Sequence, residues 1–210
     1  MRCFALPIVA LIAACDSGSG AAPKQVKTAE PERKLAGVYP ERFECTSIIP
    51  EAELQALLGA VAVKLMTSPI TPNRGLAHPC AYQVTMQTVM EAWTYDFDCR
   101  ESMKARADAL FAQYKRTSAE LVQAFNEAAD AGIKPTDAGI PIKAPEDATE
   151  VEVGAKALDH HGQGLLFIDD DAPCYVRVVG PDAPRRLALA KLIAKNLTFM
   201  NAPMTPRAAP

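Results

Sequence analysis

Apolar and polar residues alternate with a period of two over two neighbouring stretches near the middle of the chain. In "AWTYDFDC", residues 92–99, Trp93, Tyr95, Phe97 and Cys99 fall on one side and threonine and aspartate on the other. The stretch "CAYQVTMQ", residues 80–87, alternates in the same way. This pattern predicts two half-buried antiparallel strands. The preceding "VAVKLM" predicts a third strand.

Three helices are predicted around strands of this kind. "PEAELQALLG" reads as a short helix that Gly59 closes in the left-handed conformation. A long helix runs from Glu101 to Ala131, and Asp98 with Glu101 can form a capping box at its start. Its apolar residues keep a helical period, so we expect them to cover one face of the sheet. "DAPRRLALAKLIAKNL" forms the last helix, capped by Asp182.

A second run of strands lies between the long helix and the last one. "VEVGAKAL", "GLLFID" and "CYVRVVG" each predict a strand. The order is therefore helix, three strands, helix, three strands, helix. We predict an α+β domain with a largely antiparallel sheet of about six strands in two three-strand runs, packed by a long central helix and a C-terminal helix.

The composition fits one folded domain with flexible ends. Hydrophobic residues make up 49% of the 210 positions and charged residues 22%. We assign residues 15–40, which are small, polar and charged, to a flexible tether, 41–200 to a single domain and 201–210 to a disordered tail. A net charge of −3 without a basic run gives no electrostatic basis for binding nucleic acid.

The N-terminus indicates export. Residues 1–14 carry one cation, Arg2, followed by an apolar run that is too short to span a bilayer. The run leads into "IAAC", which resembles the lipobox of bacterial lipoproteins: an aliphatic residue, two small residues and cysteine. The resemblance implies a signal peptide cleaved before Cys15 and a lipid anchor on its thiol. The alternative is an ordinary cleaved signal peptide with Cys15 incidental.

The cysteine count agrees with an exported chain. Of six cysteines, Cys3 lies in the signal peptide and Cys15 takes the lipid. An even number remains, which predicts two disulfides with three open connectivities. These four are Cys45, Cys80, Cys99 and Cys174. A zinc site with four thiolate ligands would need a closely spaced C-x2-C pair, which the sequence lacks.

Two adjacent histidines, His160 and His161, precede three aspartates, residues 169–171, by one strand's length. Neighbours on a strand point to opposite faces, so the histidines can share a metal only if the chain turns at Gly162 and Gly164. We expect exposed histidines at a strand end and aspartates in a hairpin turn. The alternatives are a metal site at the histidines and a calcium site at the aspartates, whose spacing lacks the usual Asp-x-Asp-x-Asp-Gly alternation. We predict no cofactor and no metal.

"CTSIIPEAELQALLG" followed by "CAYQV" resembles the small exported lipoproteins of actinobacteria that are grouped as a domain of unknown function. The matching positions are Cys45, Ile48, Ile49, Pro50, Glu51, Leu58, Gly59, Cys80 and Tyr82. The closing "ALAKLIAKNL" resembles the last helix of that family. The chain departs from the family at Ile49, where a capping threonine is usual, and in its extra Cys99 and Cys174.

This resemblance implies a Cys45–Cys80 disulfide that ties the first helix to the sheet, which leaves Cys99 to pair with Cys174. The latter two also lie on predicted strands among apolar neighbours, so they can face each other. The resemblance implies no enzymatic activity and supplies no catalytic residues.

Together these features predict a lipid-anchored lipoprotein on the outer face of the inner (cytoplasmic) membrane or on the outer membrane. The sequence contains none of the common nucleotide-binding, serine hydrolase or zinc-protease motifs. We expect a non-enzymatic binding or assembly module of the cell envelope with an envelope protein as partner. One alternative is a carrier of an apolar or lipid ligand held between the sheet and the long helix. A hydrolase using His160 and His161 is the other.

Overall fold

The computed structural model describes residues 34–67, 72–131, 147–160 and 162–208. All of them belong to one compact unit, Arg33–Pro210. The predicted signal peptide, Cys15 and most of the predicted tether lie outside the described residues. The same holds for His161.

One seven-stranded antiparallel sheet forms the centre of the fold. In spatial order its strands are β2 (Ala62–Met66), β3 (Cys80–Thr85), β4 (Met90–Asp98), β8 (Tyr175–Val179), β7 (Gly164–Ile168), β6 (Lys156–His160) and β5 (Thr149–Glu150). The two predicted runs join where β4 pairs with β8. The predicted α+β class with an antiparallel sheet is therefore confirmed, with the two-residue strand β5 added to the expected six.

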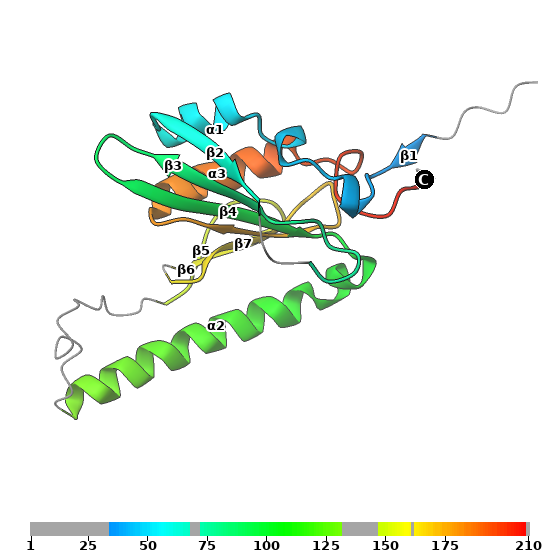
Figure 1. Ribbon diagram of the computed structural model, residues 1–210. Helices are drawn as coiled ribbons and strands as arrows, with labels where there is room; N and C mark the ends of the chain where they lie inside the picture. Colours follow the sequence, from blue (N-terminus) through cyan, green and yellow to red (C-terminus); the bar gives the residue numbers. More distant parts are fainter. Residues whose placement is uncertain (1–33, 68–71, 132–146, 161, 209–210) are drawn as a thin grey trace, which may run out of the picture. The chain divides into compact units, whose positions relative to one another are not determined.

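Helices pack on both faces of this sheet (Figure 1). Helix α1 (Glu51–Leu58) and helix α3 (Ala183–Asn196) lie on one side, and the long helix α2 (Glu101–Asp130) lies on the other. The predicted alternation places Trp93, Tyr95 and Phe97 in the main core under α1 and α3. Gly59 ends α1 at a φ of 64°, as its position in the sequence predicts.

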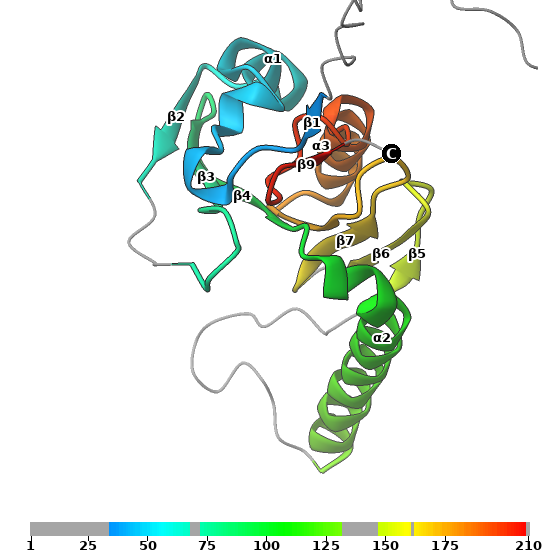
Figure 2. The ribbon, with the colours of Figure 1, turned by 90° about the vertical axis from the view of Figure 1, so that its right-hand side faces the viewer.

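Both ends of the described chain are part of the fold. Strand β1 (Leu35–Ala36) pairs with β9 (Arg207–Ala208) in a small separate sheet (Figure 2). Ala202 and Met204 are buried in the main core. Residues 35–40 of the expected tether and residues 201–208 of the expected disordered tail are therefore part of the fold, and the expectation of disorder is wrong for these two stretches. Two short 3-10 helices, Pro40–Arg42 and Cys45–Ser47, lead from β1 to α1.

Only the last three residues of the stretch "VEVGAKAL", residues 151–158, which is predicted as one strand, lie in a strand. Strand β5 stops at Glu150 and β6 begins at Lys156. Gly154 lies between them with a φ of 53°, and a Cβ there would lie 2.2 Å from the carbonyl oxygen of Ile168. That close approach leaves no room for a side chain, so glycine is required at this position between the two strands.

Helix α2 spans almost the predicted residues, but its N-terminal cap and its cover of the sheet differ from the prediction. Its N-cap is Arg100, whose side chain makes no capping hydrogen bond, so the predicted capping box between Asp98 and Glu101 does not form. The apolar side packs on the sheet through Met103, Ala107 and Phe111, all buried. Leu121 is 46% exposed, so the expected cover of the sheet applies to the first half of the helix.

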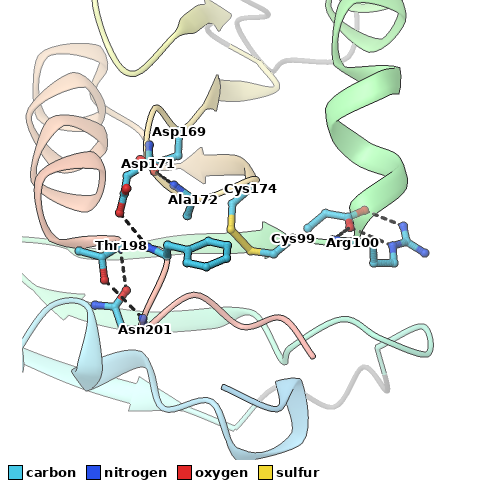
Figure 3. Close-up of a disulfide and its surroundings, with 10 residues drawn as sticks. Cys99, Arg100, Asp169, Asp171, Ala172, Cys174, Thr198 and Asn201 are labelled. Atoms are coloured by element: carbon cyan, nitrogen blue, oxygen red, sulfur yellow. Dashed lines mark hydrogen bonds and ion pairs between the residues drawn. A yellow bond between two sulfur atoms is a disulfide. The ribbon is translucent and has the colours of Figure 1, made fainter. Parts of the chain in front are cut away.

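The structure contains both disulfides, Cys45–Cys80 and Cys99–Cys174. The first ties the segment before α1 to the start of β3, as the family resemblance implies. The second joins the residue after β4 to the residue before β8, next to the turn that carries Asp169 and Asp171 (Figure 3). Because β4 and β8 are the strands that unite the two runs, this disulfide fixes the junction of the sheet.

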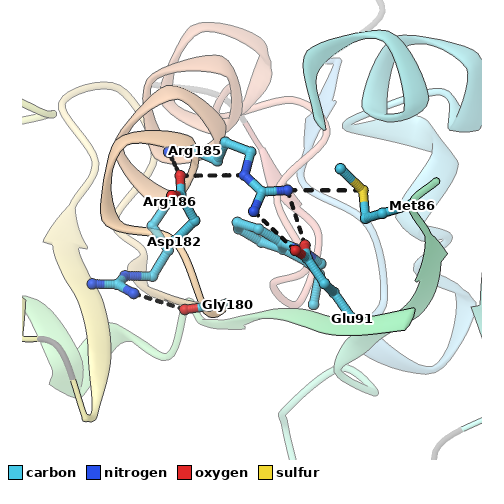
Figure 4. A network of polar contacts seen from close by, with 7 residues as sticks. Met86, Glu91, Gly180, Asp182, Arg185 and Arg186 are labelled. Atoms are coloured by element: carbon cyan, nitrogen blue, oxygen red, sulfur yellow. Dashed lines mark hydrogen bonds and ion pairs between the residues drawn. The ribbon is translucent and has the colours of Figure 1, made fainter. Parts of the chain in front are cut away.

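Helix α3 is anchored to the sheet by a polar network (Figure 4). Asp182 accepts a 2.9 Å hydrogen bond from the backbone N–H of Arg185, so the predicted cap is confirmed. The Arg185 guanidinium donates to both carboxylate oxygens of Glu91 at 2.9 Å and lies over the Trp93 ring. The Trp93 indole N–H also donates to Glu91, at 2.8 Å. These contacts hold the start of α3 against β4.

Candidate functional site

The side of the sheet that faces α2 carries charged residues where β4 meets β8. Asp96 lies directly opposite Arg177, and Asp98 lies opposite Tyr175. Arg177 donates through Nε and Nη2 to one oxygen of Asp96, Oδ2, at 3.0 and 2.8 Å. The neighbouring residue Phe97 points to the opposite side of the sheet and is buried in the main core. The period-two alternation of a strand therefore places these polar residues together on the side that faces α2.

A second aspartate–arginine pair stands beside the first. Arg100 donates from Nε to Oδ1 of Asp98 at 2.8 Å and from Nη2 to Oδ2 at 2.6 Å. Its backbone N–H also donates to Asp98, at 3.2 Å. Asp98 therefore holds the residue that precedes α2 instead of capping the helix. The chain leaves β4 and enters α2 with a guanidinium at the helix start.

These residues form the floor of an open cleft of about 590 Å³. One wall is the first part of α2, where Met103, Arg106 and Leu110 recur at helical spacing on one face. The other wall is the segment before β3, which contributes Asn73 and Leu76. The lining in the described part of the chain carries three arginines, Arg100, Arg106 and Arg177, and two aspartates, Asp96 and Asp98.

Burial raises the pKa of two residues at the floor of the cleft. Burial raises the pKa of the Asp96 carboxyl, and the facing Arg177 guanidinium opposes this effect. Burial also raises the pKa of Tyr175 to about 12. The Tyr175 phenol therefore keeps its proton at neutral pH and can act as a hydrogen-bond donor at the cleft.

The contact between α2 and the sheet next to the cleft is filled by side chains. Phe111 from α2 packs against Leu158 and Leu166 from β6 and β7, and all three are buried. Tyr114 adds to this cluster and donates a 2.9 Å hydrogen bond to the backbone carbonyl of Gly164. The carrier alternative places an apolar ligand between the sheet and the long helix. Where α2 packs on β6 and β7, that space is filled by the protein's own side chains.

His160 lies in this same contact. Its side chain is buried, so the expectation of an exposed residue at a strand end is wrong for His160. The ring meets Tyr114 of α2 edge to face at 5.8 Å, and Nδ1 accepts a 3.1 Å hydrogen bond from the backbone N–H of Gly162. The turn at Gly162 therefore positions one histidine against the helix.

The three aspartates form the expected turn between β7 and β8. Asp169 is buried and accepts hydrogen bonds from the backbone N–H groups of Asp171 and Ala172, at 3.1 and 2.8 Å. Asp171 accepts from the backbone N–H of Phe199, beyond α3 (Figure 3). Among the described residues, no group of three or more histidine, cysteine, aspartate or glutamate side chains is arranged to hold a metal ion.

One buried charge pair was missed by the sequence analysis. Arg186 is fully buried and donates to both oxygens of Asp159 at 3.0 and 3.1 Å and to the carbonyl of Gly180 at 2.7 Å. Arg186 precedes Leu189 by three positions and Ile193 by seven, so it lies on the apolar face of α3. That spacing is the signal that could have found it.

Searches of protein-family models, curated proteins and solved structures found no match to this chain. None of the helices in the described part of the chain combines the length and hydrophobicity needed to cross a membrane.

The cleft could not be predicted from the sequence pattern. Its residues come from three separate parts of the chain, the segment before β3, the β4–α2 junction and the start of β8. The sequence pattern places Asp96 on the polar side of a strand and Asp98 there and in a capping box, and neither position marks a cleft. Because the cleft depends on the pairing of β4 with β8, no contiguous motif marks it.

Proposed function

We propose that this chain is an exported, lipid-anchored lipoprotein whose α+β domain acts as a non-enzymatic binding module of the cell envelope, with the cleft between β4, β8 and α2 as its binding site. The observation that carries the proposal is the cleft itself. It gathers three arginines, two aspartates and the Tyr175 phenol on a rigid sheet in a volume typical of a ligand site.

Export is supported by the two disulfides. Disulfides form and persist in oxidising compartments such as the bacterial periplasm and are rare in the cytosol. Both join segments far apart in the sequence, over separations of 35 and 75 residues. The lipobox-like "IAAC" and the lipoprotein resemblance support an anchor at Cys15.

A binding role fits the site better than a hydrolase does. The hydrolase alternative relied on His160 and His161. The His160 ring is buried against Tyr114 of α2, and His161 lies outside the described residues. The floor of the cleft instead consists of arginine–aspartate pairs, which bind polar ligands through several hydrogen bonds. An envelope component bound in the cleft would contact these pairs at its floor.

The anchor is tested by labelling cells with radioactive palmitate. Wild-type protein should take up label and remain in the membrane fraction, and Cys15→Ser should lose both properties. Cys3→Ser is the matched control, because Cys3 lies inside the predicted signal peptide. Label on Cys15→Ser, or none on the wild type, would contradict the lipoprotein assignment.

The binding role is tested by site-specific photo-crosslinking of the full chain in cells that make it. A photoreactive residue at Asn73, exposed at the cleft, should give a discrete adduct. The control position is Lys191, exposed on α3 on the other side of the sheet. Equal adducts at both positions, or none at Asn73, would count against the cleft as a binding site.

A further inference from the structure

The charges that line the cleft do not balance. Asp96 is paired with Arg177 and Asp98 with Arg100. Arg106 is exposed on α2, and no carboxylate among the described residues forms an ion pair with it. The cleft therefore offers one guanidinium beyond the number that its own carboxylates neutralise.

We propose that the cleft binds an amphipathic anion, a phosphate or carboxylate group joined to an apolar body, with Arg106 as the direct contact to the anionic group. This inference rests on the proposed function and names its ligand class. Each guanidinium has five N–H donors in a planar fork that matches carboxylate and phosphate oxygens. Arg100 and Arg177 each use two of these donors in their aspartate pairs, so further donors remain for a ligand.

The start of α2 adds a second positive contribution. The helix is 30 residues long, and its N-cap, Arg100, gives no side-chain acceptor to the first-turn N–H groups. The N-terminal end of a helix carries a partial positive charge and favours anions. The N-cap Arg100 and the first-turn residue Met103 border the cleft. The helix end and the surplus arginine therefore act in the same direction.

The apolar part of the ligand follows from the size and walls of the cleft. A volume of about 590 Å³ is far larger than a single phosphate needs. Leu76, Met103 and Leu110 contribute apolar side chains to the two walls. An anionic group held by arginine would place an attached apolar chain against these residues.

A neighbouring pocket is lined mainly by carboxylates, so it is not expected to bind the anion. It has about 410 Å³ and is lined by Glu101 and by Asp169, Asp170 and Asp171, with Arg207 as its cation. Met103 and Tyr175 border both spaces. Like charges repel, so an anion should bind in the arginine-lined cleft and not in this pocket.

The test is isothermal titration calorimetry of the oxidised full-length chain with hexyl phosphate, inorganic phosphate and hexylammonium. Hexyl phosphate should bind saturably and more tightly than inorganic phosphate, and hexylammonium should not bind. Arg106→Gln should weaken hexyl phosphate binding at least about 10-fold, because a charge-assisted hydrogen bond is lost. The matched control is Arg116→Gln, on the same helix and paired with Glu120, which should bind as the wild type does.

Several outcomes would overturn the inference. An equal loss of hexyl phosphate affinity in the Arg106→Gln and Arg116→Gln variants would indicate a general charge effect. Equal affinity for hexyl phosphate and inorganic phosphate would show that the cleft does not bind an apolar group. Binding of hexylammonium as tight as that of hexyl phosphate would show that the cleft does not select an anion. If hexyl phosphate fails to bind while the Asn73 adduct still forms, the ligand class is wrong and the proposed function stands. If both are absent, both proposals fall.

Discussion

Arg177 binds one oxygen of the Asp96 carboxylate, its direct partner across β4 and β8, through two N–H groups at 2.8 and 3.0 Å. The pair lies at the floor of the cleft, and burial raises the pKa of Asp96 against the effect of Arg177. The carboxylate thus lowers the positive charge of the cleft. Its position on a central strand makes it a fixed part of the site.

Replacing this carboxylate should strengthen anion binding. Asp96→Asn keeps the shape of the side chain, removes a negative charge from the cleft and frees donors of Arg177. Two unit charges about 4 Å apart interact by roughly 1 kcal/mol in a water-like medium, so hexyl phosphate should bind about 5-fold more tightly. Calorimetry at low ionic strength measures this change. Weaker binding by the variant would show that Asp96 contacts the ligand as an acceptor.

The two disulfides should contribute unequally to stability. Constraint of the unfolded chain grows slowly with loop length, and the loops are 35 and 75 residues long. Cys45→Ser/Cys80→Ser and Cys99→Ser/Cys174→Ser should each lower the free energy of unfolding by about 4 kcal/mol, with the larger loss for the second pair. Urea unfolding of the paired variants measures both. A clearly larger loss for Cys45–Cys80 would contradict this loop-length account.

The buried charge pair should be sensitive to loss of one partner. Arg186→Met leaves the Asp159 carboxylate, whose side chain is 11% exposed, without its guanidinium and should cost about 3–5 kcal/mol of unfolding free energy. Lys156→Ala is the comparison on the same strand as Asp159. It breaks an exposed pair with Asp108 and should cost less than about 1 kcal/mol. Thermal or urea unfolding that ranks the two variants the other way would refute the assignment.

Glu91 should make the free energy of unfolding depend on pH in the acidic range. Hydrogen bonds from Arg185 hold the pKa of Glu91 below its ordinary value of 4.5, and burial opposes them. A carboxyl with a lowered pKa contributes stability above pH 4.5 that is lost as the pH falls through the folded-state value. Glu91→Gln should therefore be about 1–2 kcal/mol less stable than the wild type at pH 7. The difference should shrink toward pH 3, and a difference that stays constant with pH would exclude this role.

Elements whose signal is local were predictable from the sequence. The alternation through Trp93, Tyr95 and Phe97 gave β4 and its buried face, and Gly59 and Asp182 marked a helix end and a helix start. These features depend on backbone geometry within a few residues. The α+β class and the antiparallel sheet followed from the order of such elements.

Features that depend on distant partners were not predictable in the same way. Asp98 fits a capping box by spacing, but in the fold Arg100 takes its carboxylate. His160 is buried because Tyr114, 46 positions earlier in the chain, packs against it. The cleft exists because β4 pairs with β8, 81 positions apart at Asp96 and Arg177. The periodicity of apolar residues along the sequence does not indicate which distant residues will pair in the fold.

The most direct test of the binding cleft is the photo-crosslinking yield at Asn73 in cells, compared between the wild-type background and Arg106→Gln. We expect a discrete envelope adduct in the wild-type background, at least about 10-fold less of it with Arg106→Gln, and no loss with Arg116→Gln. An adduct of equal yield in all three backgrounds would contradict a ligand held by the cleft arginine.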